Sequence, residues 1–167
     1  MGYNRTVTSA ASDRAPQDPQ WLDDAEMRTW RAYLRAVNLI DRRLNEGLKQ
    51  AGDLSIEDYE VLVHLSENDD RRLRMSDLSD RLVHSQSRLT QRVDRLAKRG
   101  YVSREKCPED RRGTFACLTD EGFAALEATA PHHVQDVRDA LIDLIEPGEH
   151  EIVAEVFERI IDRLRPD

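Results

Sequence analysis

Two neighbouring arginines, Arg111 and Arg112, stand beside Gly113 in the stretch CPEDRRGTFACLT, residues 107–119. The short runs VSREKC and TFACL flank PEDRRG, a pattern that predicts two strands joined by a turn. A narrow turn that carries arginines can enter the minor groove of DNA, where the negative potential attracts guanidinium groups. The residue types at this turn therefore indicate contact with a polyanion.

The net charge of the whole chain does not favour such a partner. The 167 residues carry 25 Lys and Arg against 33 Asp and Glu, a formal charge of −8. The segment from Arg71 to Arg112 differs, with 13 basic and 6 acidic residues, a balance of +7 that leaves −15 for the rest of the chain. A cationic segment between acidic flanks is the charge distribution of a nucleic-acid-binding surface.

A second polar surface lies upstream of the turn. Ser85 is placed to cap a helix with three apolar residues on one face, Leu89, Val93 and Leu96. At about 100° per residue, the opposite face and its edges then carry Ser87, Arg88, Thr90, Gln91 and Arg95. Arginine can bind guanine through two hydrogen bonds, glutamine can bind adenine, and hydroxyls can bind a base or a phosphate. We expect this helix to read the major groove, with Asp94 marking the end of the base contacts.

Further predicted elements position these side chains. A shorter helix, with Ser76 placed as its N-cap and Leu78 and Leu82 on its apolar face, precedes the helix that begins after Ser85 and stops at Gly100. Two short helices joined by about three residues form a helix-turn-helix pattern. With the strand pair that follows, the segment predicts a mainly α fold of the α+β winged-helix type.

Longer amphipathic helices flank this segment. Between Pro19 and Gly52, apolar residues recur at spacings of three and four: Trp30, Tyr33, Val37, Ile40, Leu44 and Leu48. Ser55 is placed to cap the next helix, whose apolar residues are Ile56, Tyr59, Leu62 and Val63. Thr119 is placed to cap a long helix that extends to Leu144 and bends at Pro131, and Pro147 begins the last helix. Residues 1–18 lack periodicity and are expected to form a disordered arm.

Four motifs together resemble the MarR family of winged-helix transcription regulators, from about Leu54 to Gly122. They are LSIEDYEVLVHLSE, MSDLSDRL, SQSRLTQRVDRLAKRGYVSR and PEDRRGTFACLTDEG, the last with its Asp-x-Arg and Leu-Thr. The resemblance implies a homodimer in which the terminal helices form a dimerisation base below which two winged lobes lie. The expected divisions are an N-terminal dimerisation helix at 19–52, a winged helix-turn-helix lobe at 53–119 and C-terminal dimerisation helices at 120–167.

The resemblance also implies roles for individual residues. The major-groove helix would comprise Ser85, Gln86, Ser87, Arg88, Leu89, Thr90, Gln91 and Arg92. Arg112 would enter the minor groove, Asp110 would orient it, and Arg111 would lie near a phosphate. The expected partner is double-stranded DNA, and a two-fold symmetric protein should bind a palindromic operator with half-site centres about 10 bp apart. Its expected role is that of a repressor.

Many members of the family respond to a small aromatic acid bound between the dimerisation base and the DNA-binding lobe. Four residues lie on helices that could line such a pocket: Trp30, Tyr33, Tyr59 and His64. Core packing explains aromatic residues at helical spacing equally well, so the sequence does not name a ligand.

The two cysteines, Cys107 and Cys117, flank the predicted turn. If residues 107 and 114 pair, the cysteines are about three positions out of register, roughly 10 Å along the strands, which is too far for a disulfide. Members of the family that sense peroxides keep a reactive cysteine in the first helix, and this chain has none there. We therefore do not expect sensing of that type.

Other functions have less support. The sequence has no nucleophile paired with a base, no phosphate loop and no metal-ligand spacing, so we expect neither an enzyme nor a cofactor. It has no apolar stretch of membrane-spanning length and no hydrophobic signal core, so we expect a cytoplasmic, nucleoid-associated protein. The alternative is a winged-helix module that binds an acidic protein, although such a module has no special need for paired arginines beside a helix bearing Ser and Gln.

Overall fold

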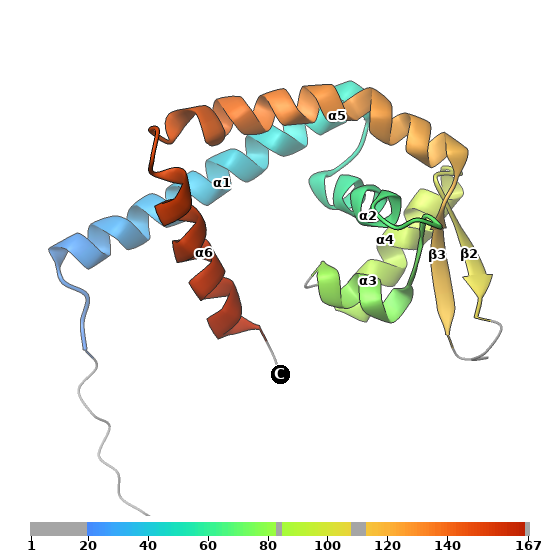
Figure 1. Cartoon of the computed structure of the whole chain (residues 1–167), viewed down its shortest axis with the longest axis horizontal. Helices are drawn as coiled ribbons and strands as arrows, with labels where there is room; N and C mark the ends of the chain where they lie inside the picture. Colours follow the sequence, from blue (N-terminus) through green and yellow to red (C-terminus); the bar gives the residue numbers. More distant parts are fainter. Residues whose placement is uncertain (1–19, 83–84, 108–112, 166–167) are drawn as a thin grey trace, which may run out of the picture. The chain divides into compact units, whose positions relative to one another are not determined.

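The chain forms six α-helices and a small antiparallel sheet within the residues that the structure, a computed structural model, describes: 20–82, 85–107 and 113–165 (Figure 1). In chain order the elements are α1 (Asp24–Gly52), α2 (Ile56–Ser66), β1 (Arg72–Arg74), α3 (Met75–Arg81), α4 (Gln86–Lys98), β2 (Val102–Lys106), β3 (Thr114–Leu118), α5 (Asp120–Ala140), the 3-10 helix η1 (Ile142–Leu144) and α6 (His150–Leu164). This arrangement confirms the predicted winged-helix fold class. The arm predicted at residues 1–18 lies outside the described residues.

Side-chain caps fix where several helices begin. Ser55 Oγ accepts a hydrogen bond from the Asp58 backbone N–H at 3.1 Å, and Thr119 Oγ1 accepts one from the Gly122 N–H at 3.0 Å. Each satisfies a donor that the first turn of a helix leaves free. These two predicted caps are confirmed, and Gly100 follows α4 with a φ of 79°, the left-handed conformation that ends a helix.

Other predicted boundaries were wrong. The first helix begins at Asp24 rather than at Pro19, because Asp23 and Glu26 each accept the other's backbone N–H, at 2.8 and 2.9 Å. Ser76 does not cap α3, because that helix begins at Met75, directly after β1. The Ser76 hydroxyl donates to Asp77 Oδ1 instead.

The C-terminal helices are also shorter than predicted. Pro131 lies within α5, which ends at Ala140, and Ile142–Leu144 form the separate 3-10 helix η1. α6 begins at His150, three residues after Pro147.

The sheet has the strand order β1-β3-β2, with β3 in the centre and antiparallel to both neighbours. Ala116 of β3 lies opposite Leu73 on one side and Arg104 on the other. The strand β1, only three residues long, was not predicted from the sequence. It joins the segment before the helix-turn-helix to the hairpin that follows it, so both are parts of one sheet.

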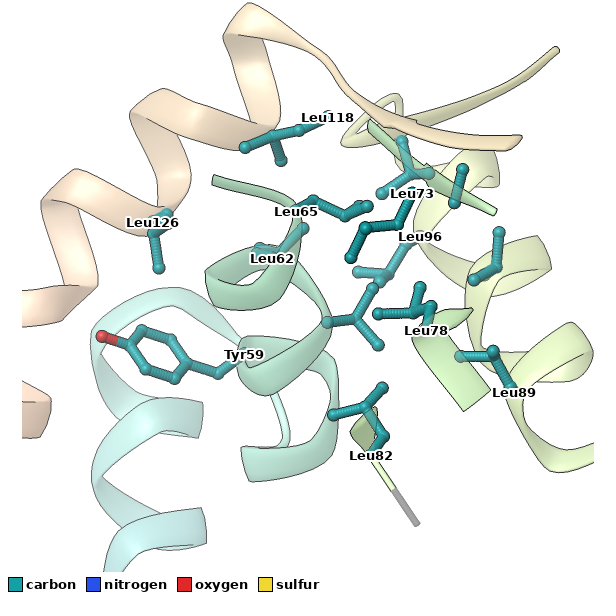
Figure 2. Close-up of a cluster of buried hydrophobic side chains, with 14 of the residues drawn as sticks. Tyr59, Leu62, Leu65, Leu73, Leu78, Leu82, Leu89, Leu96, Leu118 and Leu126 are labelled. Carbon is teal, nitrogen blue, oxygen red and sulfur yellow. The ribbon is translucent and has the colours of Figure 1, made fainter. Parts of the chain in front are cut away.

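One apolar core lies between the sheet and the helices of the lobe (Figure 2). α2, α3 and α4 supply its most buried leucines and valines, which have exposed fractions of 0%: Val61, Leu62, Leu65, Leu78, Leu89, Val93 and Leu96. Leu126 of α5 and Leu48 of α1 also belong to this core. The core holds the helix-turn-helix and the sheet as one lobe.

The N-terminal part of α1 and the whole of α6 expose large apolar side chains, unlike the helices of this lobe. Of the described residues, 20–35 belong to a unit separate from the one that begins at Ala36. In the first unit Trp30 stacks on Tyr33, with ring centroids 5.9 Å apart, and both rings are exposed. α6 has no buried residue, and its exposed apolar side chains are Ile152, Val156, Phe157, Ile160, Ile161 and Leu164. No helix in the described ranges has the length and apolar character needed to cross a membrane.

Candidate DNA-binding surface

The helix α4 has one buried and one exposed face. Ser85 has extended backbone angles, with φ −64° and ψ 143°, and its Oγ accepts the Arg88 backbone N–H at 3.5 Å, as predicted for an N-cap. The inner residues Leu89, Val93 and Leu96 are completely buried. The predicted groove-facing residues are exposed: Ser85, Gln86, Ser87, Arg88, Thr90, Gln91 and Arg95.

The first turns of α4 combine polar side chains with a positive charge. Ser85 Oγ and Ser87 Oγ are 3.2 Å apart, so the two hydroxyls share a hydrogen bond at the start of the helix. No acidic partner of Arg88 occurs among the residues that the structure describes. Together with the free backbone N–H groups of the first turn, these groups can bind phosphate oxygens or base edges.

Arg92 faces α2 instead of solvent. Its side chain is 14% exposed, and its guanidinium lies 3.2 Å from Glu57 Oε2 and 3.5 Å from Asp58 Oδ1. Burial raises the pKa of Glu57, but hydrogen bonding to Ser55 and the charge of Arg92 outweigh it, and the net pKa is below the usual value. Sequence reasoning assigned Arg92 to the groove; these contacts give it a part in holding α4 against α2.

Arg95 also contacts Asp58, but its side chain remains accessible to solvent. Its Nη2 donates to Asp58 Oδ1 at 3.2 Å, while 58% of its side chain is exposed. The Asp58 carboxylate is 8% exposed, so two arginines of α4 converge on one buried negative charge at the start of α2. A buried carboxylate needs such partners, since its desolvation is otherwise costly.

Arg104 of β2 connects the hairpin to α4. Its Nη2 lies 3.1 Å from Asp94 Oδ1 and donates to the Thr90 backbone carbonyl at 3.2 Å. The negative charge of Asp94, unfavourable near DNA, therefore has a cationic neighbour. Sequence reasoning missed this residue because VSREK has four consecutive polar residues, and their order does not show which one reaches the helix.

The strands beside the predicted arginine turn form a hairpin. Asp110, Arg111 and Arg112 lie outside the described residues, so their predicted contacts with DNA stay predictions. The strands on either side are paired from Val102–Leu118 to Lys106–Thr114, and the Cys107 N–H donates to the Gly113 carbonyl at 2.9 Å. This pairing confirms the predicted hairpin.

The cysteine register differs by one residue from the assumed one. Cys117 lies opposite Ser103, four positions from Cys107, and both thiols are free. Burial, together with the nearby Glu105 carboxylate, raises the pKa of the Cys117 thiol. This favours the neutral thiol over the reactive thiolate.

Many cations of the Arg71–Arg112 segment are already paired within the protein. Arg71 lies over the Phe123 ring at 3.9 Å and 3.2 Å from Asp120 Oδ1, and Arg72 lies 2.6 Å from Asp70 Oδ2. The balance of +7 counted from the sequence therefore overstates the charge available to a polyanion. The usable charge is concentrated on fewer residues, among them Arg88 of α4.

The four candidate ligand-binding residues fall in different settings. Trp30 and Tyr33 belong to the unit that ends at Arg35, where they stack on each other. Tyr59 is buried, with its ring centroid 4.4 Å from that of His133, and His64 Nδ1 lies 3.5 Å from Glu67 Oε2. The contacts of Tyr59 are those of a packed core side chain.

The geometry of the lobe has known counterparts. A model of the MarR family matches residues 53–113. A MarR family transcriptional regulator from Streptomyces coelicolor, solved in complex with DNA, is similar with a TM-score of 0.87 and 40% identity, over 89% of this chain and 94% of that one. This chain belongs to the MarR family. The resemblance predicted from its four motifs is thereby confirmed.

Two curated transcriptional regulators are similar in sequence. The HTH-type transcriptional regulator PecS of Dickeya dadantii is 34% identical over 121 residues, 72% of each chain. The HTH-type transcriptional repressor YetL of Bacillus subtilis is 30% identical over 106 residues, 64% of this chain and 63% of YetL. As a MarR family member, the present protein is a DNA-binding transcriptional regulator and not an enzyme, as the sequence predicted.

Proposed function

We propose that this MarR family protein is a homodimeric repressor that binds a palindromic operator through α4 and the turn between β2 and β3. The observation that carries the proposal is the N-terminal half of α4, where exposed Ser87, Arg88, Thr90 and Gln91 stand on a helix whose inner face is completely buried. A rigid helix with such groups on its free side can present them to base edges. Bound at an operator, the protein would block a promoter on the nucleoid.

The proposed dimer is supported by apolar surface that a single chain leaves uncovered. The helix α6 exposes six large apolar side chains, and Trp30, Tyr33 and Val37 of α1 are also exposed. Exposed apolar surface of this extent usually marks an interface. We assign α1 and the segment 120–167 to dimerisation and the segment 53–119 to DNA binding. The repressor named YetL supports repression as the outcome.

Release from DNA by a small aromatic ligand is the proposed regulation. Its support is the family membership. A panel of aromatic acids, added during operator titrations, would identify a ligand as one that weakens operator binding without unfolding the protein.

A selection from random double-stranded DNA, followed by titration of the selected site, tests the proposal. We expect enrichment of an inverted repeat, with each half-site contacted by one chain, and weaker binding to an isolated half-site. A protein-interaction module with an acidic partner is the alternative. Enrichment of no sequence, together with binding that disappears at moderate salt, would favour that alternative and contradict operator recognition.

A further inference from the structure

Two arginines of α4 and the arginine at its C-cap reach the junction between α1 and α2. Arg92, Arg95 and Arg99 follow one another at spacings of three and four, so they lie along one side of the helix. Arg92 and Arg95 contact Asp58, while Arg99 reaches the end of α1. These three arginines thus all contact the short segment from Gly52 to Asp58.

Arg99 makes the contact that connects α4 directly to α1. Its Nη1 donates to the Asp53 carbonyl at 2.6 Å, and its Nη2 donates to the Gly52 carbonyl at 3.2 Å. The last carbonyls of a helix lack partners within the helix and carry its negative dipole end. Asp53 has a φ of 52°, so the chain turns sharply there, and Arg99 binds the carbonyls on both sides of the turn.

The guanidinium of Arg99 is itself held in place. It lies over the Tyr101 ring at 4.7 Å, and Nη2 donates to the Tyr101 hydroxyl at 3.3 Å. Arg99 is also the C-cap residue of α4, so its side chain leaves the helix at the point where α4 ends. A planar cation with several directed hydrogen bonds constrains the orientation of α4 in addition to the apolar packing of Leu89, Val93 and Leu96.

We propose that Arg99 is a positioning residue that fixes the orientation of α4 relative to the end of α1 and thereby sets the half-site spacing that the dimer accepts. This inference rests on the proposed function, in which α1 belongs to the dimerisation region and each α4 reads one half-site. One added base pair moves a half-site by about 3.4 Å and turns it around the DNA axis. A firmly held α4 should reject that displacement, and a loosely held α4 should tolerate it.

The experiment compares affinities for three DNAs: the operator selected by the wild-type protein and versions with one base pair added to or removed from its centre. Wild-type protein, Arg99→Ala, Arg99→Lys, Tyr101→Phe and the control Lys98→Ala are titrated against all three. Lys98 is the adjacent exposed cation, and its side chain has no hydrogen bond or ion pair with the described residues. Lys98→Ala therefore removes the same charge without removing the attachment.

We expect Arg99→Ala to reduce the discrimination between the selected and altered spacings by a factor of about 3 or more, within the range of couplings between contacting residues. Arg99→Lys keeps the charge but loses the two-pronged geometry, so discrimination should still fall. Tyr101→Phe removes one hydrogen bond and should change the ratio slightly in the same direction, which keeps the test valid if Arg99→Ala does not fold.

The outcomes distinguish a failure of this inference from a failure of the proposed function. Arg99 variants that weaken all three DNAs equally, as Lys98→Ala is expected to do, would show that Arg99 supplies only charge and would overturn the inference. Wild-type protein that binds all three spacings alike would instead contradict the proposed two-fold reading of an operator. Reduced discrimination in the Arg99 variants, with unchanged discrimination in Lys98→Ala, would support both.

Discussion

Burial and ion pairing divide the basic residues of α4 into two groups. Arg88 is exposed and has no acidic partner in the described part of the chain, whereas Arg92 is enclosed by Glu57 and Asp58. A free guanidinium can exchange water for a base edge at little cost to the fold. An enclosed one must first break its ion pairs. Replacing Arg88 should therefore reduce DNA binding, whereas replacing Arg92 should reduce the stability of the fold.

Replacing Arg88 or Gln91 with alanine should weaken binding to the selected operator by about 1–3 kcal/mol for each well-formed hydrogen-bonded pair with a base, with little change on random DNA. Arg92→Ala should instead lower the unfolding free energy, by about 1–3 kcal/mol, because Asp58 loses one of its two arginine partners and keeps Arg95. Titrations on both DNAs and denaturant unfolding of each variant measure the two effects. Equal reductions of affinity on operator and random DNA for Arg88→Ala would contradict its role in base reading.

His133 of α5 is expected to make the stability of the protein depend on pH. Burial against Tyr59 lowers the pKa of His133, and this effect exceeds the opposite one of the Asp136 carboxylate. Because the folded pKa is depressed, the unfolded chain takes up the proton more readily, so stability falls as the pH drops below the unfolded value of about 6.5 and towards the folded pKa.

His133→Gln should therefore lose less stability between about pH 7.5 and pH 5.5 than the wild-type protein does, since this window spans the unfolded pKa of histidine. The measurement is the denaturant midpoint at each pH, with His132→Gln as the control, since His132 is the adjacent, exposed histidine. An identical pH dependence in the wild-type protein and His133→Gln would mean that His133 keeps an ordinary pKa in the fold.

At the scale of elements, a glycine of α1 leaves room for a carboxylate of α5. A Cβ atom added to Gly47 would lie 1.7 Å from Asp136 Oδ2, and that carboxylate also pairs with Arg43 of α1 at 2.7 Å. The carboxylate of α5 thus occupies the space that the missing side chain leaves. This packing joins two of the proposed dimerisation helices within one chain.

Gly47→Ala should destabilise the protein by about 1–3 kcal/mol, because a well-packed site resists added volume. The sign is informative, since alanine in an open helix interior is favoured over glycine by about 1 kcal/mol. Thermal and denaturant unfolding measure the change, and the double variant Gly47→Ala, Asp136→Ala serves as a control because it removes the obstructing carboxylate. A stabilised single variant would show that α5 moves aside without cost.

The sequence predicted elements well where local chemistry determines them. Ser55, Ser85 and Thr119 cap helices through hydrogen bonds to residues three positions away, so their roles are visible in a short window. β1 is not visible in this way, because three residues reading RLR become a strand only by pairing with β3. Ser76 has a suitable cap sequence, but the strand before it fixes the helix start at Met75.

In the candidate site, too, the sequence predicted the features that depend on local pattern and not those that depend on the tertiary fold. Helical periodicity was sufficient to predict which side of α4 is exposed, because the buried triad of leucines and valine repeats every three to four residues. It could not reveal that Arg92 and Arg95 meet Asp58, or that Arg104 meets Asp94, since these partners are joined only by the tertiary fold. Sequence charge counts treat such paired arginines as free.

At the scale of the whole molecule, charge and symmetry set the dependence on salt. We propose that Arg112 of each of the two subunits contacts the minor groove of the DNA. If each of these arginines replaces the counterion of one phosphate, it contributes about one unit to the slope of log affinity against log salt. Arg112→Ala should flatten that slope by about 1–2 units and weaken operator and random DNA by similar factors. Titrations at several salt concentrations decide this, and an unchanged affinity together with an unchanged slope would contradict the proposed contact of Arg112 with DNA.

Because α6 exposes an apolar face, we expect two chains to associate through it. Ile160 is 45% exposed and lies among other exposed apolar side chains of α6, so a charge placed there would have to be desolvated in a dimer interface. We expect wild-type protein to sediment as a dimer at micromolar concentration and Ile160→Lys to shift it towards monomer and weaken operator binding. Glu158→Gln changes the net charge by the same amount at an exposed polar position of α6 and should leave the dimer intact. A stable wild-type monomer, or equal behaviour of the two variants, would exclude α6 from the interface.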